Sequence, residues 1–216
     1  MSRFGMRTDG WGAQGWSLTH DVVHAYPISP SEKQQRRMSK FIQLLPKILP
    51  CIFCRRGSRK HLKTLMWKHR KFIYLASQES LEKFMWQLHN LVNKSLGKPE
   101  IRHNQIKYTN IWQQWDFFSC VARDFPLESK KTHYHRRFIH LLCYLFPGKE
   151  WRRCWRKALH DLQWKRNKDI FTRDRESFSH FMWMIQNVVK EQLQKEKTVS
   201  YFEWKTNVEQ LRASGK

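Results

Sequence analysis

Two cysteines, Cys51 and Cys54, carry the clearest chemical signal in the sequence. They form a Cys-x-x-Cys motif that follows Pro50, where one predicted helix ends and the next begins. At a helix start the backbone N–H groups and the helix dipole stabilise a thiolate, and Arg55 and Arg56 add positive charge. Two sulfurs at this spacing close a disulfide on one helical turn, as a redox pair requires. The motif therefore favours redox chemistry.

Half of a zinc site is the main alternative for this motif, and a pair of buried thiols is the next. A structural zinc ion takes four protein ligands. The sequence contains no second Cys-x-x-Cys that would complete such a site. We therefore expect a redox pair and no metal.

Three polar residues, His89, Asn90 and Asn93, form a second candidate group. They lie on a predicted helix that begins near Ser77. His89 and Asn93 are four residues apart, so they share a face with Trp86. On their own, such residues are typical of the polar surface of a helical bundle, but an internal copy of this helix changes that interpretation.

The chain contains an internal duplication at an offset of 97 residues. The segments 41–50 and 79–92 both return at this offset in recognisable form. Shorter matches at nearby offsets follow in the same order: Tyr26-Pro27 with Phe125-Pro126, Trp16 with Trp115, and Trp112 with Trp204. Several matches in one order predict two related units, residues 1–110 and 111–216.

Both units are predicted to be helical bundles, so the fold class is all-α. Only 8 glycines and 7 prolines interrupt the chain. An S-x-x-E capping box at Ser29, with Pro30 at the first helical position, predicts one helix start, and Gly97 fits the left-handed cap after a later helix. Apolar stripes with helical spacing are expected in the core: Met38, Phe41, Ile42, Leu45 and Ile48, then Leu81, Phe84, Met85, Leu88, Leu91 and Val92, and in the copy Phe178, Phe181, Met182, Ile185, Val188 and Val189.

The two units differ at polar and thiol positions while they keep the apolar ones. At the same offset, the residues lost from the copy are Cys51, replaced by Gly148, Cys54 by Trp151, His89 by Gln186 and Asn93 by Lys190. A core that is copied without its chemistry indicates one working unit followed by a degenerate copy.

The net charge is +23, from 41 Lys and Arg against 18 Asp and Glu. Such a field attracts nucleic acid, acidic lipid or acidic proteins at low salt without choosing among them, so we expect non-specific contact with polyanions. No apolar run is long enough for a membrane span, and residues 1–15 have no signal-peptide core. The odd count of 5 cysteines suits a protein that handles thiols.

In combination and order, these motifs resemble the Erv/augmenter-of-liver-regeneration family of sulfhydryl oxidases. The resemblance covers residues 11–115, about half of the chain. It is carried by Trp11-Gly12-x-x-x-Trp16-x-x-x-His20, Tyr26-Pro27, Pro50-Cys-Ile-Phe-Cys54 and His89-Asn-Leu-Val-Asn93-Lys-Ser-Leu-Gly-Lys-Pro99.

The resemblance implies a four-helix bundle, with a short fifth helix, that holds FAD non-covalently beside the cysteine pair. Cys54 would be the flavin-proximal sulfur, and Cys51 would exchange with the incoming dithiol. The resemblance puts these residues around the cofactor: Gly12, Trp16, His20, Trp86, His89, Asn90, Asn93, Lys98 and Trp112. Substrates would be dithiol proteins or a thioredoxin-like shuttle, and molecular oxygen would be reduced to H2O2.

The chain departs from the family in its other cysteines. The family's additional structural disulfide has no counterpart here, and the shuttle pair that many members carry on a terminal arm is not evident. Cys120, Cys143 and Cys154 all fall in the degenerate unit. We expect buried free thiols there, with a disulfide between Cys143 and Cys154 as the alternative.

Members of the family usually pair two identical bundles across a two-fold axis, and in the quiescin branch a degenerate Erv-like unit takes the place of a partner. We therefore expect an intramolecular pseudo-dimer of the two units. The divergent second unit looks most like the oxidases of large DNA viruses, which implies the host cytoplasm or the virion. The mitochondrial intermembrane space is the alternative compartment.

Two other functions compete with the oxidase. One is a basic virion structural or nucleic-acid-binding protein that retains an inactive redox fold. A weaker one is a zinc-dependent nucleic-acid-binding module. The oxidase is favoured because Cys51, Cys54, His89 and Asn93 are all intact in one unit.

Overall fold

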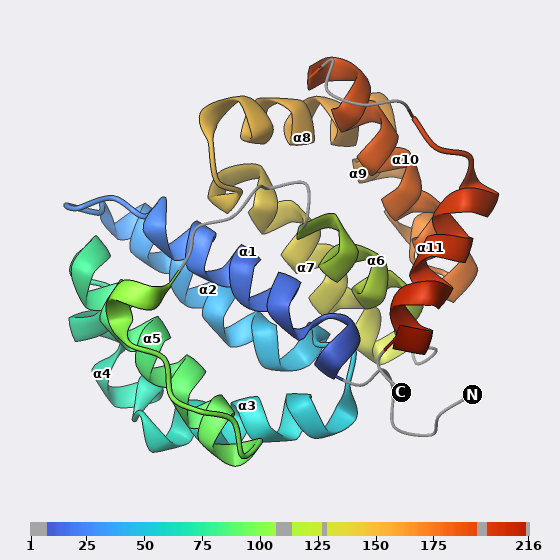
Figure 1. The fold of residues 1–216 in the computed structure, drawn as a ribbon. Helices are drawn as coiled ribbons and strands as arrows, with labels where there is room; N and C mark the ends of the chain where they lie inside the picture. Colours follow the sequence, from blue (N-terminus) through green and yellow to red (C-terminus); the bar gives the residue numbers. More distant parts are fainter. Residues whose placement is uncertain (1–7, 107–113, 127–128, 194–197, 215–216) are drawn as a thin grey trace.

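The computed structural model describes residues 8–106, 114–126, 129–193 and 198–214, and every regular element in them is helical (Figure 1). The first half holds α1 (Gly12–His24), α2 (Glu32–Ile48), α3 (Ile52–Thr64), α4 (Trp67–Tyr74) and α5 (Gln78–Ser95), with the 3-10 turns η1 (Thr8–Gly10) and η2 (His103–Gln105). The second half holds α6 (Trp115–Arg123), α7 (Ser129–Leu145), α8 (Lys149–Asp161), α9 (Trp164–Phe171), α10 (Arg175–Leu193) and α11 (Tyr201–Ser214). The all-α prediction is confirmed.

The helices of the second half repeat those of the first. Helices α7, α8 and α9 begin and end 97 residues after α2, α3 and α4, and α10 begins 97 residues after α5. Even the left-handed residues that open the short helices correspond: Met66 (φ 53°) precedes α4 and Gln163 (φ 49°) precedes α9. In Figure 1 the first set runs from blue to green and the second from yellow-green to red, with α1, α2, α6 and α7 at the centre.

The repeat also includes the hydrogen bonds that join each long helix, α5 or α10, to the segment after it. The indole of Trp86 and the amide of Asn90 on α5 both donate to the Ile101 carbonyl, at 2.7 and 3.0 Å. On α10 the same two residue types donate to the Val199 carbonyl, at 2.8 and 3.0 Å. Each long helix therefore holds the segment after it in the same way.

The start of α2 differs from the predicted capping box. Ser31, not Ser29, is the N-cap: its hydroxyl accepts from the Gln34 N–H at 3.4 Å, and the Gln34 side chain accepts from the Ser31 N–H at 2.8 Å. Pro30 lies before the helix rather than at its first position. Glutamine completes such a box as glutamate does, so the box forms two residues later than predicted.

The predicted apolar stripes form the core, apart from one edge. The stripe residues of α2 are all buried, and so are those of α10 except Val188. On α5, Leu91 and Val92 are only half-buried, and Val92 lines a cavity rather than the core. Gly97 takes φ 66° after α5, as predicted.

The two halves meet along α2 and α7, which are counterparts of each other. Phe41 on α2 stacks on Phe138 on α7, with ring centroids 5.9 Å apart. Phe138 is the residue that corresponds to Phe41 in the repeat. Both side chains are buried, so the contact lies inside the core.

Two cation–π contacts flank this aromatic stack. Arg37 lies over the Tyr144 ring at 3.6 Å, and Lys47 lies over the Tyr134 ring at 4.1 Å. Tyr144 corresponds to Lys47 in the repeat and Tyr134 corresponds to Arg37, so each contact is the other with the two halves exchanged. Reciprocal contacts of this kind are what a two-fold relation between two surfaces produces.

Helices α1 and α6, which also correspond, pack closely. Trp11 contacts Phe117 of α6 with ring centroids 6.0 Å apart. Gly15 faces the same ring so closely that a Cβ atom there would lie 3.1 Å from it. A larger residue at position 15 would require the Phe117 ring to shift.

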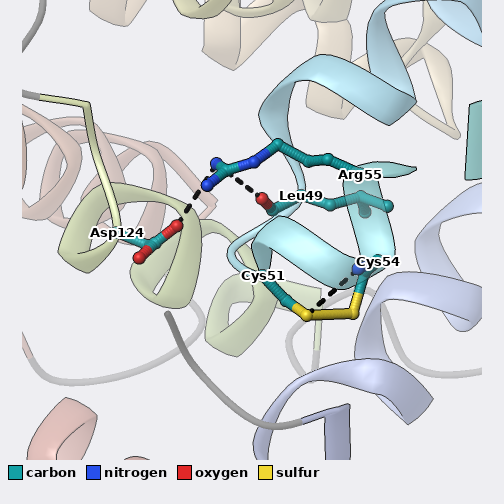
Figure 2. Close-up of a disulfide and its surroundings, with 5 residues drawn as sticks. All are labelled: Leu49, Cys51, Cys54, Arg55 and Asp124. Carbon is teal, nitrogen blue, oxygen red and sulfur yellow. Dashed lines mark hydrogen bonds and ion pairs between the residues drawn. A yellow bond between two sulfur atoms is a disulfide. The ribbon is translucent and has the colours of Figure 1, made fainter. Parts of the chain in front are cut away.

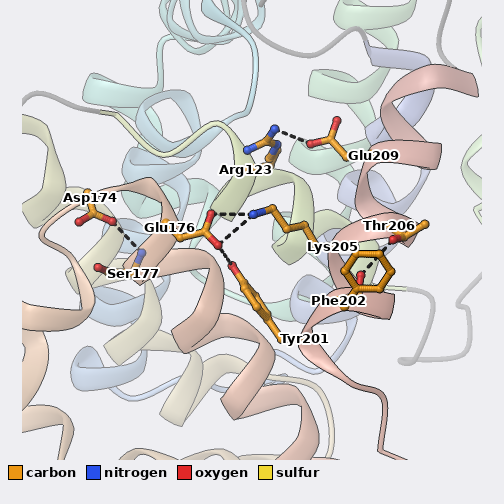
Figure 3. Close-up of polar contacts among 9 residues, drawn as sticks. All are labelled: Arg123, Asp174, Glu176, Ser177, Tyr201, Phe202, Lys205, Thr206 and Glu209. Atoms are coloured by element: carbon orange, nitrogen blue, oxygen red, sulfur yellow. Dashed lines mark hydrogen bonds and ion pairs between the residues drawn. The ribbon is translucent and has the colours of Figure 1, made fainter.

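Helix α11 closes the second half against α10 and α6 (Figure 3). Glu176 at the start of α10 accepts hydrogen bonds from Lys205 at 3.0 Å and from the Tyr201 hydroxyl at 2.9 Å. Arg123 of α6 forms an ion pair with Glu209 of α11. These contacts fix the last described helix to two earlier ones.

Candidate functional site

The two cysteines of the motif are joined in a disulfide at the start of α3 (Figure 2). Their Cα atoms are 5.1 Å apart. Cys51 is the N-cap of α3, and its sulfur accepts a hydrogen bond from the Cys54 N–H at 3.2 Å. The pair therefore sits where helix N–H groups stabilise a thiolate, as the sequence predicted.

Exposure distinguishes the two sulfurs. Cys54 is half-buried and lines a large cavity. Cys51 does not line that cavity, and it is only 7% exposed. A thiolate must reach a disulfide sulfur directly in order to exchange with it. Of the two cysteines, Cys51 is therefore the less accessible in this conformation.

Arg55 ties the start of α3 to the second half of the chain (Figure 2). Its guanidinium donates to the Leu49 carbonyl at 3.0 Å and pairs with the carboxylate of Asp124 at 3.3 Å. Asp124 is the C-cap residue of α6. Arg56, the second cation expected beside the cysteines, is exposed. The charge of Arg55 is thus balanced by α6 and does not act on the cysteines alone.

A cavity of about 850 Å³ opens beside Cys54. Its walls come from η1, α1, α2, α3, α5 and the segment after α5, with one residue of α6. Among the residues expected to hold a cofactor, it is lined by Gly12, Trp16, His20, His89, Asn93 and Lys98. This volume lies within the usual range for small-molecule and cofactor sites.

Three flat rings form one wall of this cavity. Trp16 stacks on His89, with ring centroids 3.9 Å apart and planes 8° from parallel. The His20 Nε2 and His89 Nδ1 atoms are 3.0 Å apart, so one ring donates a hydrogen bond to the other. Burial, with the charge of His89 as a second cause, lowers the pKa of His20 to about 3, and burial lowers the pKa of His89 to about 4. Both histidines are therefore neutral at pH 7.

The polar residues lie toward the segment that follows α5. Asn93 is buried, and its amide donates to the Pro99 carbonyl at 3.2 Å. The Lys98 ammonium lies 3.9 Å from the carboxylate of Asp9, and both side chains are about half exposed. Gly12 has an open side: a Cβ atom there would meet only Thr8, at 3.7 Å.

Trp86 and Asn90 are not among the residues that line the cavity, and the cofactor contact that the resemblance implies for them stays a prediction. They lie on the part of α5 that faces the following segment, where both bind the backbone of Ile101. Ile101 does line the cavity, so the two residues position its wall. The corresponding residues of the second half, Trp183 and Asn187, are of the same types and both donate to the Val199 carbonyl, which favours a structural role for the pair. Trp112 lies outside the described residues.

Helix α3 contributes a row of lining residues that sequence reasoning missed. Gly57, Ser58 and His61 follow Cys54 at helical spacing and line the cavity on the same face. Burial, followed by the charge of Lys60, lowers the pKa of His61. The periodicity counted from Cys54 is the signal that could have found them.

Phe117 of α6 is another lining residue that the sequence analysis missed. It also packs against Trp11 and Gly15 of the first half. Its place depends on how α6 docks on α1, and no local motif in the sequence encodes that contact. The second half therefore contributes directly to the wall of the cavity.

The corresponding space in the second half is filled by indole side chains. Trp155 replaces Ser58 in the repeat, is 1% exposed, and stacks on Trp115 at 5.7 Å. Trp151 replaces Cys54 and stacks on Phe146 at 5.8 Å. Within the described residues, indole rings therefore stand where the first half has the cavity-lining side chains of Ser58 and Cys54.

The remaining cysteines are free and buried. This confirms the expectation of buried thiols, and the alternative disulfide between Cys143 and Cys154 is not formed. Burial raises the pKa of Cys120 to about 12 and the pKa of Cys143 to about 11, and it also raises the pKa of Cys154. Such thiols carry little thiolate at neutral pH.

Within the ranges that the structure describes, no three His, Cys, Asp or Glu side chains gather as metal ligands would. His20 and His24 on α1 have the four-residue spacing that some zinc sites use, but they face different neighbours, His89 and Glu82. In the same ranges no helix has the length and apolar character that crossing a membrane requires.

Comparison with known proteins identifies the family. A model of the Erv1 / Alr family matches residues 13–115. The probable FAD-linked sulfhydryl oxidase R368 of Acanthamoeba polyphaga mimivirus is 34% identical over 93 residues, which are 43% of this chain and 63% of that protein. The putative FAD-linked sulfhydryl oxidase 347L of Invertebrate iridescent virus 6 is 33% identical over 90 residues, which are 41% of this chain and 81% of that protein. The chain belongs to the Erv1/Alr family.

The Erv1/Alr match ends at the first residue of α6. The mitochondrial FAD-linked sulfhydryl oxidase ERV1 of Saccharomyces cerevisiae is 31% identical over 93 residues, which are 43% of this chain and 46% of that protein. The chain thus spans about half of the yeast protein and under two thirds of the mimivirus one. A comparison with solved structures gives no match.

Proposed function

We propose that this Erv1/Alr protein is an FAD-dependent sulfhydryl oxidase that forms disulfides in dithiol substrates and reduces molecular oxygen to H2O2. One observation carries the proposal: a sulfur of the Cys51–Cys54 disulfide lines a cavity walled by flat, neutral rings. The relatives in yeast, plants and viruses, all named FAD-linked sulfhydryl oxidases, support the same function.

The side chains of the cavity fit a flavin dinucleotide. Trp16 and His89 offer faces on which an aromatic ring system can stack. Lys98, about half exposed at one edge of the cavity, is suited to a phosphate group. FAD, when bound, supplies a two-electron acceptor that can pass electrons on to oxygen. Gly12, His20 and Asn93 complete the set that we propose for cofactor binding.

The cysteines move electrons from the substrate toward the cavity. A substrate thiolate attacks the Cys51 sulfur, the Cys51–Cys54 bond breaks, and Cys54 leaves as a thiolate at the start of α3. The second substrate thiol then displaces Cys51, so the substrate has lost two electrons and two protons and the cysteine pair has gained them. Cys54 faces the cavity and is therefore the residue that passes the electron pair on while the disulfide re-forms.

Flavin content tests this function. The purified protein should be yellow, release FAD on denaturation, and keep its colour in the presence of a metal chelator. His89→Ala should weaken FAD binding because it removes the ring stacked on Trp16. Gln186→Ala, the matched change in the second half, should leave FAD bound. A protein that takes up no flavin even from added FAD would contradict the proposal.

We also propose that residues 1–110 and 111–216 are two Erv-like units that form an intramolecular pseudo-dimer. Its support is the reciprocal pairing of α2 with α7 and the packing of α1 on α6. Deleting residues 116–216 would uncover the Phe41 face of α2 and should make the remainder self-associate. A truncated protein that sediments as a soluble monomer and retains full activity would argue against the pseudo-dimer.

The substrates we propose are dithiol proteins or a thioredoxin-like shuttle. The relatives in mimivirus and in an iridescent virus favour a viral protein that acts in the host cytoplasm or the virion. The yeast relative is named mitochondrial, and the mitochondrial intermembrane space is the alternative. The net charge of +23 supports non-specific contact with polyanions, which should weaken steeply as salt rises.

A further inference from the structure

A second cavity lies where the two halves meet, away from the cysteine pair. Its volume is about 270 Å³, and α1, α2, α7 and α8 contribute to its walls. Three arginines line it: Arg37 of α2, and Arg152 and Arg156 of α8. No residue of the proposed cofactor set belongs to it.

The three guanidinium groups are held in place without a carboxylate. Arg152 donates to the Phe146 carbonyl and Arg156 donates to the Cys143 carbonyl, each at 2.8 Å. Arg37 lies over the Tyr144 ring, with its guanidinium carbon 3.6 Å from the ring centroid. Within the described residues, none of the three forms an ion pair with Asp or Glu.

The end of α7 offers these cations only a partial negative charge. Cys143 and Phe146 stand at the end of that helix, where the dipole is equivalent to about half an elementary charge. Each arginine has five N–H donors, and one backbone carbonyl satisfies only one of them. Burial, with the charge of Arg156 as a second cause, lowers the pKa of Arg152, as expected for a cation without a countercharge.

The internal repeat shows what is missing from this cavity. Arg152 corresponds to Arg55, which pairs with Asp124 at 3.3 Å (Figure 2). Asp124 is the C-cap residue of α6, and the C-cap residue of the matching helix α1 is Ala25. Ala25 lines the second cavity. Arg55 therefore has a carboxylate partner, Asp124, whereas the corresponding Arg152 shares a cavity with Ala25, which offers no charge.

We infer that this second cavity is a binding site for a phosphate group of a small molecule, which supplies the negative charge that Ala25 lacks. Guanidinium groups donate to phosphate oxygens in the paired geometry that such groups prefer. A phosphate carries close to two negative charges at neutral pH, so it balances several arginines where a single carboxylate balances one. The inference does not rest on the oxidase function.

Titration calorimetry with the full-length protein, saturated with FAD so that the larger cavity is occupied, tests the site. Orthophosphate, pyrophosphate and AMP are the probes, in a low-salt buffer without other polyvalent anions. Saturable binding of one probe per chain is expected. Orthophosphate binding identifies free phosphate as a ligand, whereas binding of AMP alone identifies a phosphate carried on a larger molecule. Acetate is the carboxylate probe and should bind at least about tenfold more weakly.

Three variants distinguish phosphate binding in the second cavity from non-specific binding to the basic surface. Arg152→Gln combined with Arg156→Gln should weaken binding about tenfold or more, because two of the three cations are removed. Ala25→Asp should weaken it as strongly, because the new carboxylate pairs with Arg152 as Asp124 pairs with Arg55. Arg59→Gln removes the counterpart of Arg156 on the exposed face of α3 and should leave the affinity unchanged.

Two results of these titrations would overturn the inference. Position 25 is exposed, so Ala25→Asp remains informative even if the double arginine variant fails to fold. No saturable binding to the wild-type protein overturns the inference. Equal affinity in the wild type, Ala25→Asp and Arg59→Gln also overturns it, because binding would then come from the surface charge as a whole.

Discussion

Phe41 and Phe138 occupy the same position in the two copies of the repeat, and their rings stack on each other with centroids 5.9 Å apart. A residue that meets its own counterpart lies on or beside a two-fold axis in a symmetrical dimer. Here both residues belong to one chain, and the reciprocal contacts of Arg37 and Lys47 flank them. Helices α2 and α7 thus meet as the matching helices of two subunits would.

The stack should contribute measurably to stability. Both rings are buried, so Phe41→Ala or Phe138→Ala should each lower the free energy of unfolding by about 3–5 kcal/mol. The double variant should cost less than the sum of the two, since the rings also interact with each other. Urea unfolding of the four proteins measures this coupling. Strict additivity would show that the two halves do not support each other at this contact.

The second prediction concerns cofactor stoichiometry. The space in the second half that corresponds to the cysteine-side cavity is occupied by Trp155 and Trp151. We therefore expect one FAD per chain, measured as released flavin against protein concentration. A ratio near two would mean that these indoles move aside, and it would contradict the assignment of the second half as a degenerate unit.

Much of this arrangement could be predicted from the sequence, because the repeat and the apolar periodicity are encoded by residues that are near neighbours in the chain. The helices and the place of the cysteine pair at a helix start follow from such local patterns. The place of Trp16 and His89 beside a cofactor is implied by the family resemblance alone, and their stacking joins two distant segments of the chain. The hydrogen bond from Trp86 to the Ile101 carbonyl could not be predicted from the helical face of Trp86 alone, since it depends on where the segment at Ile101 runs. The contribution of Phe117 depends on docking between α1 and α6, which periodicity does not describe.

The buried thiols should be dispensable for chemistry. Changing Cys120, Cys143 and Cys154 together to Ala should leave turnover of dithiothreitol within about twofold, since burial keeps these groups protonated. The variant should unfold at a somewhat lower temperature because small cavities are created. Oxygen uptake and a thermal melt measure both effects. A selective loss with protein substrates would reveal a shuttle role for one of these cysteines.

Acid should destabilise the protein through its buried histidines. Burial lowers the pKa of His135 to about 3, and it is only 1% exposed. In the unfolded chain His135 takes up a proton near pH 6.5, whereas in the folded protein it stays neutral until the pH is much lower. Its contribution to the free energy of unfolding is therefore fully present above pH 6.5 and is lost as the pH drops toward 3. His20 and His89 act in the same direction.

A single substitution isolates the contribution of His135 to this pH dependence. His135→Met installs the residue found at the counterpart position, Met38. Its free energy of unfolding should fall less steeply with acid than that of the wild type, by about 1 kcal/mol per pH unit well below pH 6.5. Urea unfolding at pH 7.5, 5.5 and 4.5 gives the two slopes. Parallel slopes would show that His135 titrates normally in the folded state.

The central claim is that Cys51 and Cys54 pass electrons from a dithiol to a flavin in the cavity that Cys54 lines. The most direct test is oxygen consumption with dithiothreitol, measured on the FAD-loaded wild type and on Cys54→Ser. The wild type should consume oxygen and produce H2O2 in equal amounts. Cys54→Ser should keep its flavin and lose turnover by about a thousandfold or more, because the sulfur at the cavity wall has no substitute. A Cys54→Ser protein that oxidises dithiothreitol at close to the wild-type rate would contradict the account.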